Sequence, residues 1–403
     1  MQCNFLVTYR RVPRIFVMAA LTLLVVWLLP GCAGTQSVVP SQSSKLPDWR
    51  AWPLERKIAQ MLMLGFPGET ITPDSQISVA IRDYKIGGVV LFDNNVDLDV
   101  HDRNITGPAQ LKTLTDSLWS YADTPIFVAV DEEGGIISRL KDRYGFPSSV
   151  SAAYLGEKND LNLTRTASGK LVDNLVHYRI NLNLAPVVDL NLNPANPVIA
   201  VKQRSYSADS AVVTAHAAEV IKSHHRRNVV TCLKHFPGHG SSRDDSHMGL
   251  VDVTSTWSEK ELAPYKNLID LGVVDMVMTA HTFNTAIDPD YPATLSKNTI
   301  DGILRKRLGY DGVVASDDLY MGAIAQHYSY ETVLEKAINA GVDLLLLAND
   351  KQNSPDIAPR TIETLRKMVE SGRISRERID QACGRIMALK AKYLYNFISR
   401  QEQ

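Results

Sequence analysis

Short apolar runs recur along the chain from about residue 50, and each is followed by a stretch with helical periodicity. The runs are rich in Val, Leu and Ile and alternate little between apolar and polar residues, which is typical of strands buried on both faces. Amphipathic stretches such as 207–227 and 296–310 predict the intervening helices. We expect eight strands, within 61–66, 87–92, 126–131, 182–189, 229–236, 274–281, 312–318 and 342–350.

Eight strand–helix units in one span of this length predict a single (β/α)8 barrel of the TIM type. An open, doubly wound sheet is the structural alternative, but it would more often carry a glycine-rich phosphate turn after its first strand. The residues after the first run, GFPGET (65–70), match such a turn poorly. The pattern therefore favours the barrel, which we place at residues 50–403.

Polar residues stand at the carboxyl ends of most of these runs. They are Asp131, Asp189, Lys234, His235, His281, Asp317, Asp318, Asn349 and Asp350. In a barrel these ends converge on one mouth, where active sites are built. A single charged strand end usually marks only where the strand meets water, but so many of them favour an enzyme over an inert scaffold.

The N-terminus has the pattern of a bacterial lipoprotein signal. Three arginines precede an apolar stretch, 15–29, that is too short to span a bilayer comfortably. LPGC follows, so Cys32 is expected to become the first mature residue and to carry lipid. We predict a signal peptide at 1–31, a flexible tether at 32–49 and an exported, membrane-anchored protein facing the periplasm or the cell surface. An uncleaved membrane anchor is the alternative.

Charge and cysteine usage narrow the remaining choices. The net charge is −1 and basic residues are dispersed, whereas a protein that binds nucleic acid would present a basic face. Cys232 lies in an apolar strand pattern and Cys383 in a terminal helix pattern. Two free, buried thiols are the simpler interpretation, and a disulfide between them is the alternative. The sequence leaves the oligomeric state open.

Two long motifs carry a family resemblance. The stretches LKHFPGHGSSRDDSH (233–247) and PATLSKNTIDGILRKRLGYDGVVASDDLYMGAI (292–324) resemble glycoside hydrolase family 3. Within it they resemble the β-N-acetylglucosaminidase branch, which trims peptidoglycan fragments or chitin oligosaccharides. Shorter matches, such as QMLMLGF and AGVDLLLLAND, extend the resemblance to about 55–395. It implies a retaining exo-β-N-acetylglucosaminidase on a (β/α)8 barrel, with an oligosaccharide as its substrate and with no cofactor or metal.

Retention needs a carboxylate that attacks the anomeric carbon and an acid that protonates the departing oxygen. Asp317 matches the family nucleophile, and we assign its neighbour Asp318, which points to the other face of the strand, to capping the next turn. The resembling branch takes its acid from a histidine held by an aspartate on a mobile loop, here His247 and Asp245. The neighbouring glycines and serines are expected to let this loop swing over bound sugar.

Five further residues match family positions that hold the sugar. Asp131 and Arg139, in VDEEGGIISRL, match a pair whose aspartate grips outer hydroxyls through both oxygens. Lys234 and His235 match residues that contact sugar hydroxyls, and Arg204 matches a substrate-binding arginine. For each arginine an ordinary surface ion pair is the alternative, because most arginines form only that.

Other residues of these motifs receive plainer roles. His239 is expected to satisfy backbone groups of its own turn, and His281 to lie near the site behind the residues that touch substrate. The chain departs from the family at Ile136, where an arginine is usual, and at Gln203, where an asparagine is more common. A zinc site is a weaker alternative, because the spacing lacks a recognised zinc pattern. Its ligands would be His235, His239, Asp245 and His247.

Three other functions stay open at this point. A β-glucosidase of the same family is the nearest, and the Asp-Ser-His loop argues against it. A phosphorylase is the second, because a histidine acid leaves no fixed carboxylate to repel phosphate. A non-catalytic, cell-wall-binding lipoprotein is the third, although a decayed site would be expected to lose Asp317, Asp245 or His247. Many relatives carry a second α/β-sandwich domain, which we do not expect here.

Overall fold

The computed structural model describes residues 48–95, 100–101, 103–245, 249–349 and 354–401. Cys32, with the predicted signal peptide and nearly all of the tether, lies outside these residues, so lipidation stays a prediction. No helix of the described ranges is both long enough and apolar enough to cross a membrane.

Eight parallel strands form a sheet that closes on itself. A parallel bridge between Ala315 and Leu344 joins the two ends of the sheet, and this closure excludes an open, doubly wound sheet. The barrel is confirmed, and each of the eight predicted runs contains one of its strands. In spatial order they are β11 (Val313–Ser316), β9 (Met276–Thr279), β7 (Val230–Phe236), β6 (Leu182–Asn183), β5 (Phe127–Val130), β2 (Gly88–Leu91), β1 (Leu62–Leu64) and β12 (Leu345–Leu347).

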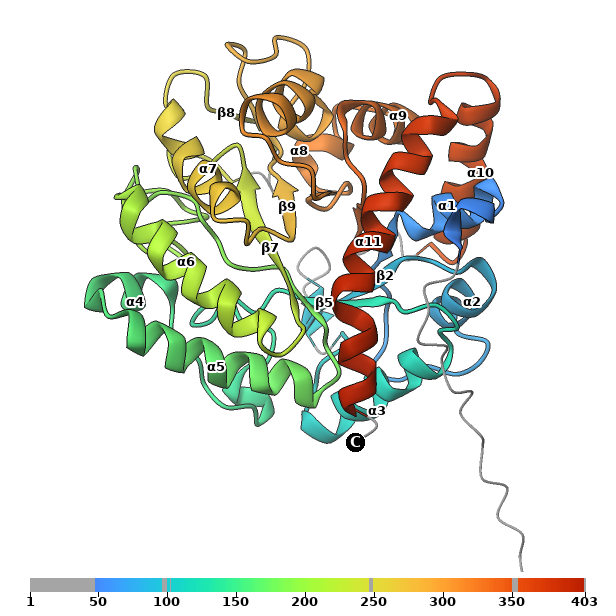
Figure 1. The fold of residues 1–403 in the computed structure, drawn as a ribbon, viewed down its shortest axis with the longest axis horizontal. Coiled ribbons are helices and arrows are strands. Elements are labelled where there is room, and N and C mark those ends of the chain that lie inside the picture. The colour runs from blue at the N-terminus through green and yellow to red at the C-terminus, as the bar shows by residue number, and fades with distance from the viewer. Residues whose placement is uncertain (1–47, 96–99, 102, 246–248, 350–353, 402–403) are drawn as a thin grey trace, which may run out of the picture. The chain divides into compact units, whose positions relative to one another are not determined.

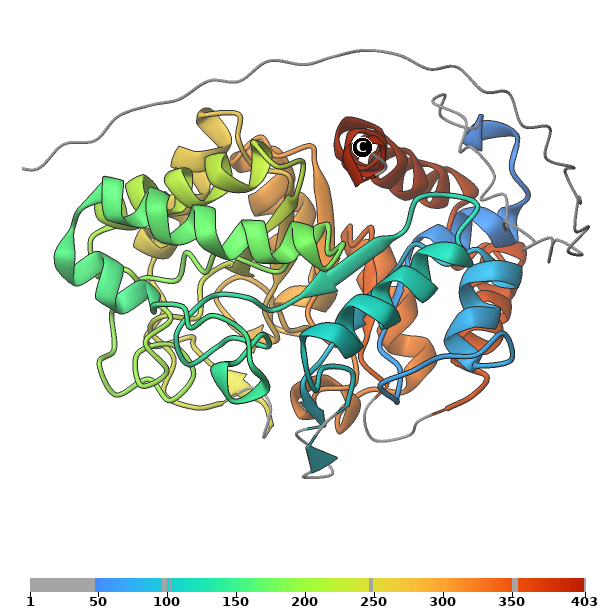
Figure 2. The same cartoon turned by 90° about the horizontal axis from the view of Figure 1, so that it is seen from below.

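Helices lie outside the strands in both views (Figures 1 and 2). The two stretches predicted as helices are α6 and η6, although η6 has the hydrogen bonding of a π-helix. The α-helices are α1 (Leu54–Gln60), α2 (Gln76–Val79), α3 (Pro108–Ser120), α4 (Ala152–Lys158), α5 (Leu161–His177), α6 (Ser210–His225), α7 (Ala263–Asp270), α8 (Gly322–Ala325), α9 (Tyr330–Ala340), α10 (Ile357–Glu370) and α11 (Arg376–Gln401). The 3₁₀- and π-helices are η1 (Trp49–Ala51), η2 (Ala80–Tyr84), η3 (Asp142–Tyr144), η4 (Glu259–Leu262), η5 (Ala293–Leu295) and η6 (Asn298–Arg307).

Local sequence explains where these helices begin. The side chain of Asp160 accepts hydrogen bonds from two amides of the first turn of α5, and Asp209 accepts one at the start of α6. Ser329 does the same for α9. Each cap satisfies backbone donors that a helix start leaves without partners.

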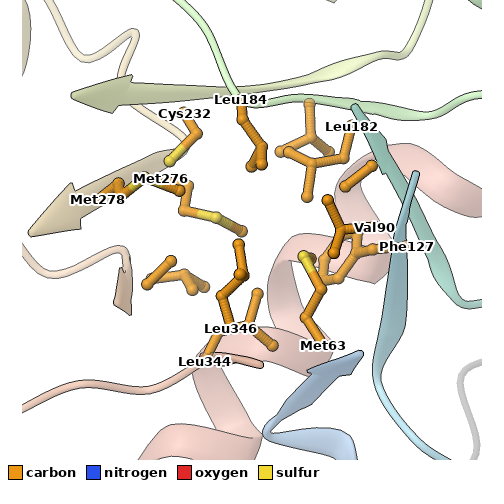
Figure 3. Packing of buried hydrophobic residues seen from close by; sticks show 14 of the residues in the cluster. Met63, Val90, Phe127, Leu182, Leu184, Cys232, Met276, Met278, Leu344 and Leu346 are labelled. Carbon is orange, nitrogen blue, oxygen red and sulfur yellow. The ribbon is translucent and has the colours of Figure 1, made fainter. Parts of the chain in front are cut away.

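Buried apolar side chains pack together inside the barrel (Figure 3). Cys232 belongs to this packed interior, and Cys383 lies buried in α11. Both cysteines are free, so the two buried thiols are confirmed. The labelled residues of the interior are Met63, Val90, Phe127, Leu182, Leu184, Cys232, Met276, Met278, Leu344 and Leu346.

Helix α11 covers the amino end of the barrel. The ammonium of Lys390 donates to the side chain of Gln60, just before β1, over 2.8 Å. The hydroxyl of Tyr393 donates to Asp275, just before β9, over 2.7 Å. The opposite, carboxyl end therefore forms the mouth.

Two short strand pairs lie outside the barrel sheet and were not predicted. Strand β3 (Asn94–Asn95) pairs antiparallel with β4 (Val100–His101). Strand β8 (Val251–Asp252) pairs parallel with β10 (Thr282–Phe283) and so joins the connections that follow β7 and β9.

Candidate active site

A buried lysine lies near the carboxyl end of β7. Lys234 is 2% exposed, and its ammonium lies 2.6 Å from an oxygen of Asp131 and 2.7 Å from an oxygen of Glu133. Burial would lower the pKa of Lys234, but the two carboxylates outweigh burial and raise this pKa. Burial would raise the pKa of Asp131, but Lys234 and Arg139 outweigh it and lower this pKa. Lys234 and Asp131 are therefore both charged in the folded protein.

Glu133 links this lysine to Arg204. The guanidinium of Arg204 donates to both oxygens of Glu133, over 2.8 and 2.7 Å. Burial would raise the pKa of Glu133, but Arg204 and Lys234 hold it far below its usual value. Sequence reasoning missed Glu133, although it lies two residues after Asp131 and so shares its face of the chain. The pair is buried, which excludes the surface ion pair considered for Arg204.

His235 is held by protein groups at both ring nitrogens. Its Nδ1 lies 2.7 Å from Asp189, and a nitrogen of Arg204 lies 3.2 Å from its Nε2. Arginine can only donate, so Nε2 is the acceptor and Nδ1 carries the proton that His235 donates to Asp189. Asp189 also accepts the backbone amide of His239 over 2.8 Å. Asp189 is thus a further site residue, which sequence reasoning left as an unassigned strand end.

Arg139 bridges two carboxylates of the mouth. One of its nitrogens lies 3.6 Å from Asp131, and another donates to Asp93 over 3.2 Å. Asp93 is fully buried and is also paired with Lys141 and, at 3.3 Å, with Arg143. This cluster joins the end of β2 to the connection after β5. Arg139 is accordingly part of a network and not an isolated surface pair.

Glu132 points away from the mouth, opposite to its neighbours Asp131 and Glu133. Its carboxyl accepts hydrogen bonds from the hydroxyl of Ser138 and from the amides of Arg139 and Leu140. Burial raises the pKa of Glu132 to about 7. Glu132 therefore fixes the backbone that carries Arg139.

Asp317 lies half-buried at the end of β11, and its amide donates to the carbonyl of Thr279 on β9. One of its oxygens accepts the amide of Asp318 over 2.8 Å. Asp318 itself accepts the amides of Tyr320 and Ala348, at 3.3 and 2.8 Å. The predicted capping role of Asp318 is confirmed.

His281 supports this turn from behind. Its Nε2 donates to the carbonyl of Asp318 over 2.8 Å, and its Nδ1 lies 2.8 Å from the hydroxyl of Thr294. The side chain is buried. The prediction that His281 lies near the site is confirmed.

The glycines after β7 are packed rather than loose. A Cβ on Gly240 would lie 1.8 Å from the carbonyl oxygen of Leu190, and a Cβ on Gly238 would meet another side chain at 2.5 Å. Ser241 and Ser242 are buried. The expectation that these residues let the loop swing is therefore wrong for 238–242, because close approach and not flexibility requires glycine here.

The predicted catalytic dyad is only partly described. Asp245 is half-buried, with one oxygen 4.0 Å from the ammonium of Lys202, and His247 lies outside the described residues. His239 is buried, and its Nδ1 lies 2.6 Å from the hydroxyl of Ser242. It is a hydrogen-bonded residue of the turn, as predicted, but this partner is a side chain and not a backbone group. Burial lowers the pKa of His239 to about 4.

The described residues contain no group of three or more His, Cys, Asp or Glu side chains placed to hold a metal ion. Five of the eight predicted catalytic and sugar-binding residues form one connected network, through Glu133 and Asp189. They are Asp131, Arg139, Arg204, Lys234 and His235. Asp317 ends a strand of the same mouth, two positions from β7 in the ring.

Comparison with known proteins identifies the family of this chain. The profile of the Glycosyl hydrolase family 3 N terminal domain matches residues 53–389. The chain belongs to glycoside hydrolase family 3. The resemblance seen in the sequence is thus confirmed at the level of the family.

Relatives in the family include proteins with named activities. The chain is 32% identical over 375 residues to Beta-hexosaminidase A of Pseudoalteromonas piscicida, covering 83% of this chain and 60% of that protein. It superposes on a family 3 β-N-acetylglucosaminidase of Paenibacillus sp. with a TM-score of 0.76 and 36% identity, covering 86% of this chain and 64% of the other. It also superposes on the β-N-acetylhexosaminidase of Beutenbergia cavernae, with a TM-score of 0.74 and 27% identity, covering 84% of this chain and 98% of the other. The chain thus spans less than two thirds of the first two relatives and nearly all of the third.

Proposed function

We propose that the protein is a retaining exo-β-N-acetylglucosaminidase that removes terminal β-linked N-acetylglucosamine from oligosaccharides. The observation that carries the proposal is a half-buried carboxylate, Asp317, at the same mouth as the charged network around Lys234. The names of the related family 3 enzymes support this activity over that of a β-glucosidase.

The proposed reaction has two steps. Asp317 attacks the anomeric carbon while His247 gives its proton to the departing glycosidic oxygen, so a glycosyl–enzyme ester forms and the shortened saccharide leaves. In the second step water attacks the anomeric carbon, His247 takes the proton of the water, and the Asp317 carboxylate is released. Asp245 would hold the imidazole in the correct tautomer and stabilise its charged form.

The network around Lys234 supplies the binding part of the proposal. Asp131 is 18% exposed, and Lys234 and Arg139 flank it, so its oxygens are fixed before a sugar arrives. Carboxylate oxygens held in this way accept hydrogen bonds from adjacent sugar hydroxyls with little rearrangement. Glu133 and Asp189, in turn, orient Arg204 and His235.

We further propose that the enzyme is tethered to a membrane through lipid on Cys32 and works outside the cytoplasm. The support is the signal-like pattern of the first 32 residues and the polar composition of 32–49. Its substrates would then be peptidoglycan fragments or chitin oligosaccharides.

Release of p-nitrophenol from its β-N-acetylglucosaminide and its β-glucoside tests the activity. We expect the wild type to prefer the N-acetylglucosaminide, and Asp317→Asn to lose at least about 10³-fold in kcat, because no carboxylate remains to attack. Asp318→Asn is the matched control: an asparagine oxygen can still accept the two amides, so most activity should remain. Preference for the glucoside would refute the substrate. Formation of sugar 1-phosphate in phosphate buffer would show that the enzyme is a phosphorylase and not a hydrolase.

A further inference from the structure

Glu261 is a buried carboxyl with no role in the reaction proposed above. It is 1% exposed and lies on η4, the short 3₁₀ turn before α7. One of its oxygens accepts the amide of Gly240 over 2.9 Å, and the other accepts the hydroxyl of Ser241 over 2.5 Å. A Cβ on Gly238 would lie 2.5 Å from the Cβ of Glu261, so the backbone passes directly against this side chain.

The same stretch of backbone, 237–242, is held from its other side. Asn196 donates to the carbonyl of His239 over 2.8 Å, and Asn193 donates to the carbonyl of Ser242 over 2.8 Å. On the side of η4, Trp257 donates to the carbonyl of Pro237 over 3.1 Å. Residues 237–242 are thus clamped between 193–196 and 257–261.

The clamped stretch ends at Ser242, three residues before Asp245 of the predicted catalytic pair. Ser242 is buried, whereas Arg243 and Asp244 are exposed, and Asp245 follows them. The position and direction of the chain at Ser242 therefore set where Asp245 can lie, because only two residues separate them.

A buried carboxyl group lowers stability relative to an apolar side chain, because its charged form is costly to bury. Burial raises the pKa of Glu261 to about 7, which reflects the cost of charge at this place. An apolar side chain of the same length would avoid that cost but could accept neither hydrogen bond. Two acceptors on one rigid group fix the amide of Gly240 and the hydroxyl of Ser241 relative to each other.

We propose that Glu261 is a positioning residue for proton transfer: it fixes residues 238–242 and thereby sets the position of Asp245, the third residue after Ser242. This inference rests on the proposed function, because it takes Asp245 and His247 as the proton-transfer pair. Glu261 itself touches neither substrate nor the reacting atoms.

The test compares two leaving groups in wild type and Glu261→Met. The departing sugar of N,N′-diacetylchitobiose needs a proton, whereas p-nitrophenolate leaves without one. General acid catalysis contributes about 10²–10⁴-fold, so a misplaced acid should lower kcat/KM for chitobiose by at least about tenfold and for the aryl glycoside by less than about threefold. Loss of folded protein alone would lower both by the same factor.

Three variants make this outcome specific. Glu261→Gln keeps an acceptor for the amide and a donor for the hydroxyl oxygen, so its ratio of the two rates should return towards that of wild type. Glu259→Gln, on the same turn but paired at the surface with Arg307, should leave the ratio unchanged. Ser241→Ala removes one of the two contacts and should shift the ratio in the same direction but less, which keeps a test if Glu261→Met does not fold.

An unchanged ratio in both Glu261→Met and Ser241→Ala, with an active wild type, overturns the inference. A wild type that cleaves neither substrate refutes the proposed function instead. In that case hydrogen exchange tests the role of Glu261, because the amide of Gly240 donates to this side chain and should exchange faster in Glu261→Met. Equal exchange in the two proteins would overturn the positioning role as well.

Discussion

The two ends of the barrel both bury charge, but they arrange it differently. At the amino end, fully buried Asp343 is paired with Arg305, Arg378 and Arg385, at 2.7, 2.8 and 3.4 Å, and helix α11 covers this end. At the mouth, Lys234 is paired with both Asp131 and Glu133. The side chains of Asp131 and Arg139 there are 18% and 20% exposed. The same pairing chemistry joins elements at one end and prepares oxygens and nitrogens for a ligand at the other. Substitutions at the amino end should therefore lower stability, whereas substitutions at the mouth should lower activity.

The largest effect is expected for Lys234→Met. The change leaves Asp131 and Glu133 facing each other in a buried site and removes a fixed donor, which at other active sites costs about 10²–10³-fold. We expect kcat/KM on the p-nitrophenyl glycoside to fall by about that factor. Circular dichroism would establish that the variant is folded. Lys297→Met, at an exposed position, is the control, and full activity of Lys234→Met would break the comparison.

Asp343→Asn should lower stability and leave activity unchanged. Three arginines would lose their shared charge partner, and breaking a buried ion pair typically costs about 3–5 kcal/mol of unfolding free energy. We expect that loss in urea titrations, with kcat/KM of the folded protein unchanged. Asp311→Asn is a matched control, because Asp311 pairs with Arg385 over 2.8 Å but is 90% exposed, so its loss should cost under about 1 kcal/mol. A lower kcat/KM without lower stability in Asp343→Asn would contradict the division between the two ends.

Lys390, also at the amino end, predicts a pH dependence of stability. Burial lowers its pKa from 10.5 to about 7, and its ammonium donates a hydrogen bond to the neutral side chain of Gln60. Between these two values the unfolded chain binds a proton that the folded chain does not, so the unfolding free energy should rise with pH through this window. Lys390→Met should be more stable than wild type below pH 7 and should lack this rise. Urea titrations from pH 6 to 10 measure the difference, and parallel curves for the two proteins would refute it.

A smaller change of stability with pH, of opposite sign, is expected from Glu132, which lies behind the mouth. The pKa of Glu132 is raised from 4.5 to about 7, so the folded chain binds the extra proton and stability should fall as pH rises between these values. Glu132→Gln should lack this part of the slope. Gln can still accept hydrogen bonds from the backbone that carries Arg139, so KM should change by only a few-fold. The measurement is the difference between wild type and variant from pH 4 to 8, and a difference independent of pH would refute the assignment.

The barrel was predictable because its strands are buried on both faces and therefore read as uninterrupted apolar runs. The residues at their ends were predictable for a related reason, since the carboxyl ends of barrel strands converge on one mouth. Lys234, His235 and Asp317 all follow from this logic together with the family motifs.

What the sequence did not reveal depends on approach between distant segments. Asp93 pairs with residues 46–50 positions away, and Glu261 clamps a turn about twenty residues before it. Gly240 shows the same limit: a glycine in a polar stretch suggests freedom, but the carbonyl of Leu190 is what excludes a side chain there. Glu133 did have a readable signal, its spacing of two from Asp131, and Asp189 had one in its place at the end of an apolar run.

The bridge between Ala315 and Leu344 has a consequence for the chain's neighbours in a crowded compartment. Because it joins the first and last strands of the sheet, no barrel strand offers an unpaired row of amides and carbonyls to another molecule. A chain cut before β12 would lose this protection at two strands, because β11 and β1 would both become edge strands without a partner. Strand β11 leads directly into Asp317, so the nucleophile's own strand would then be exposed to cross-β pairing.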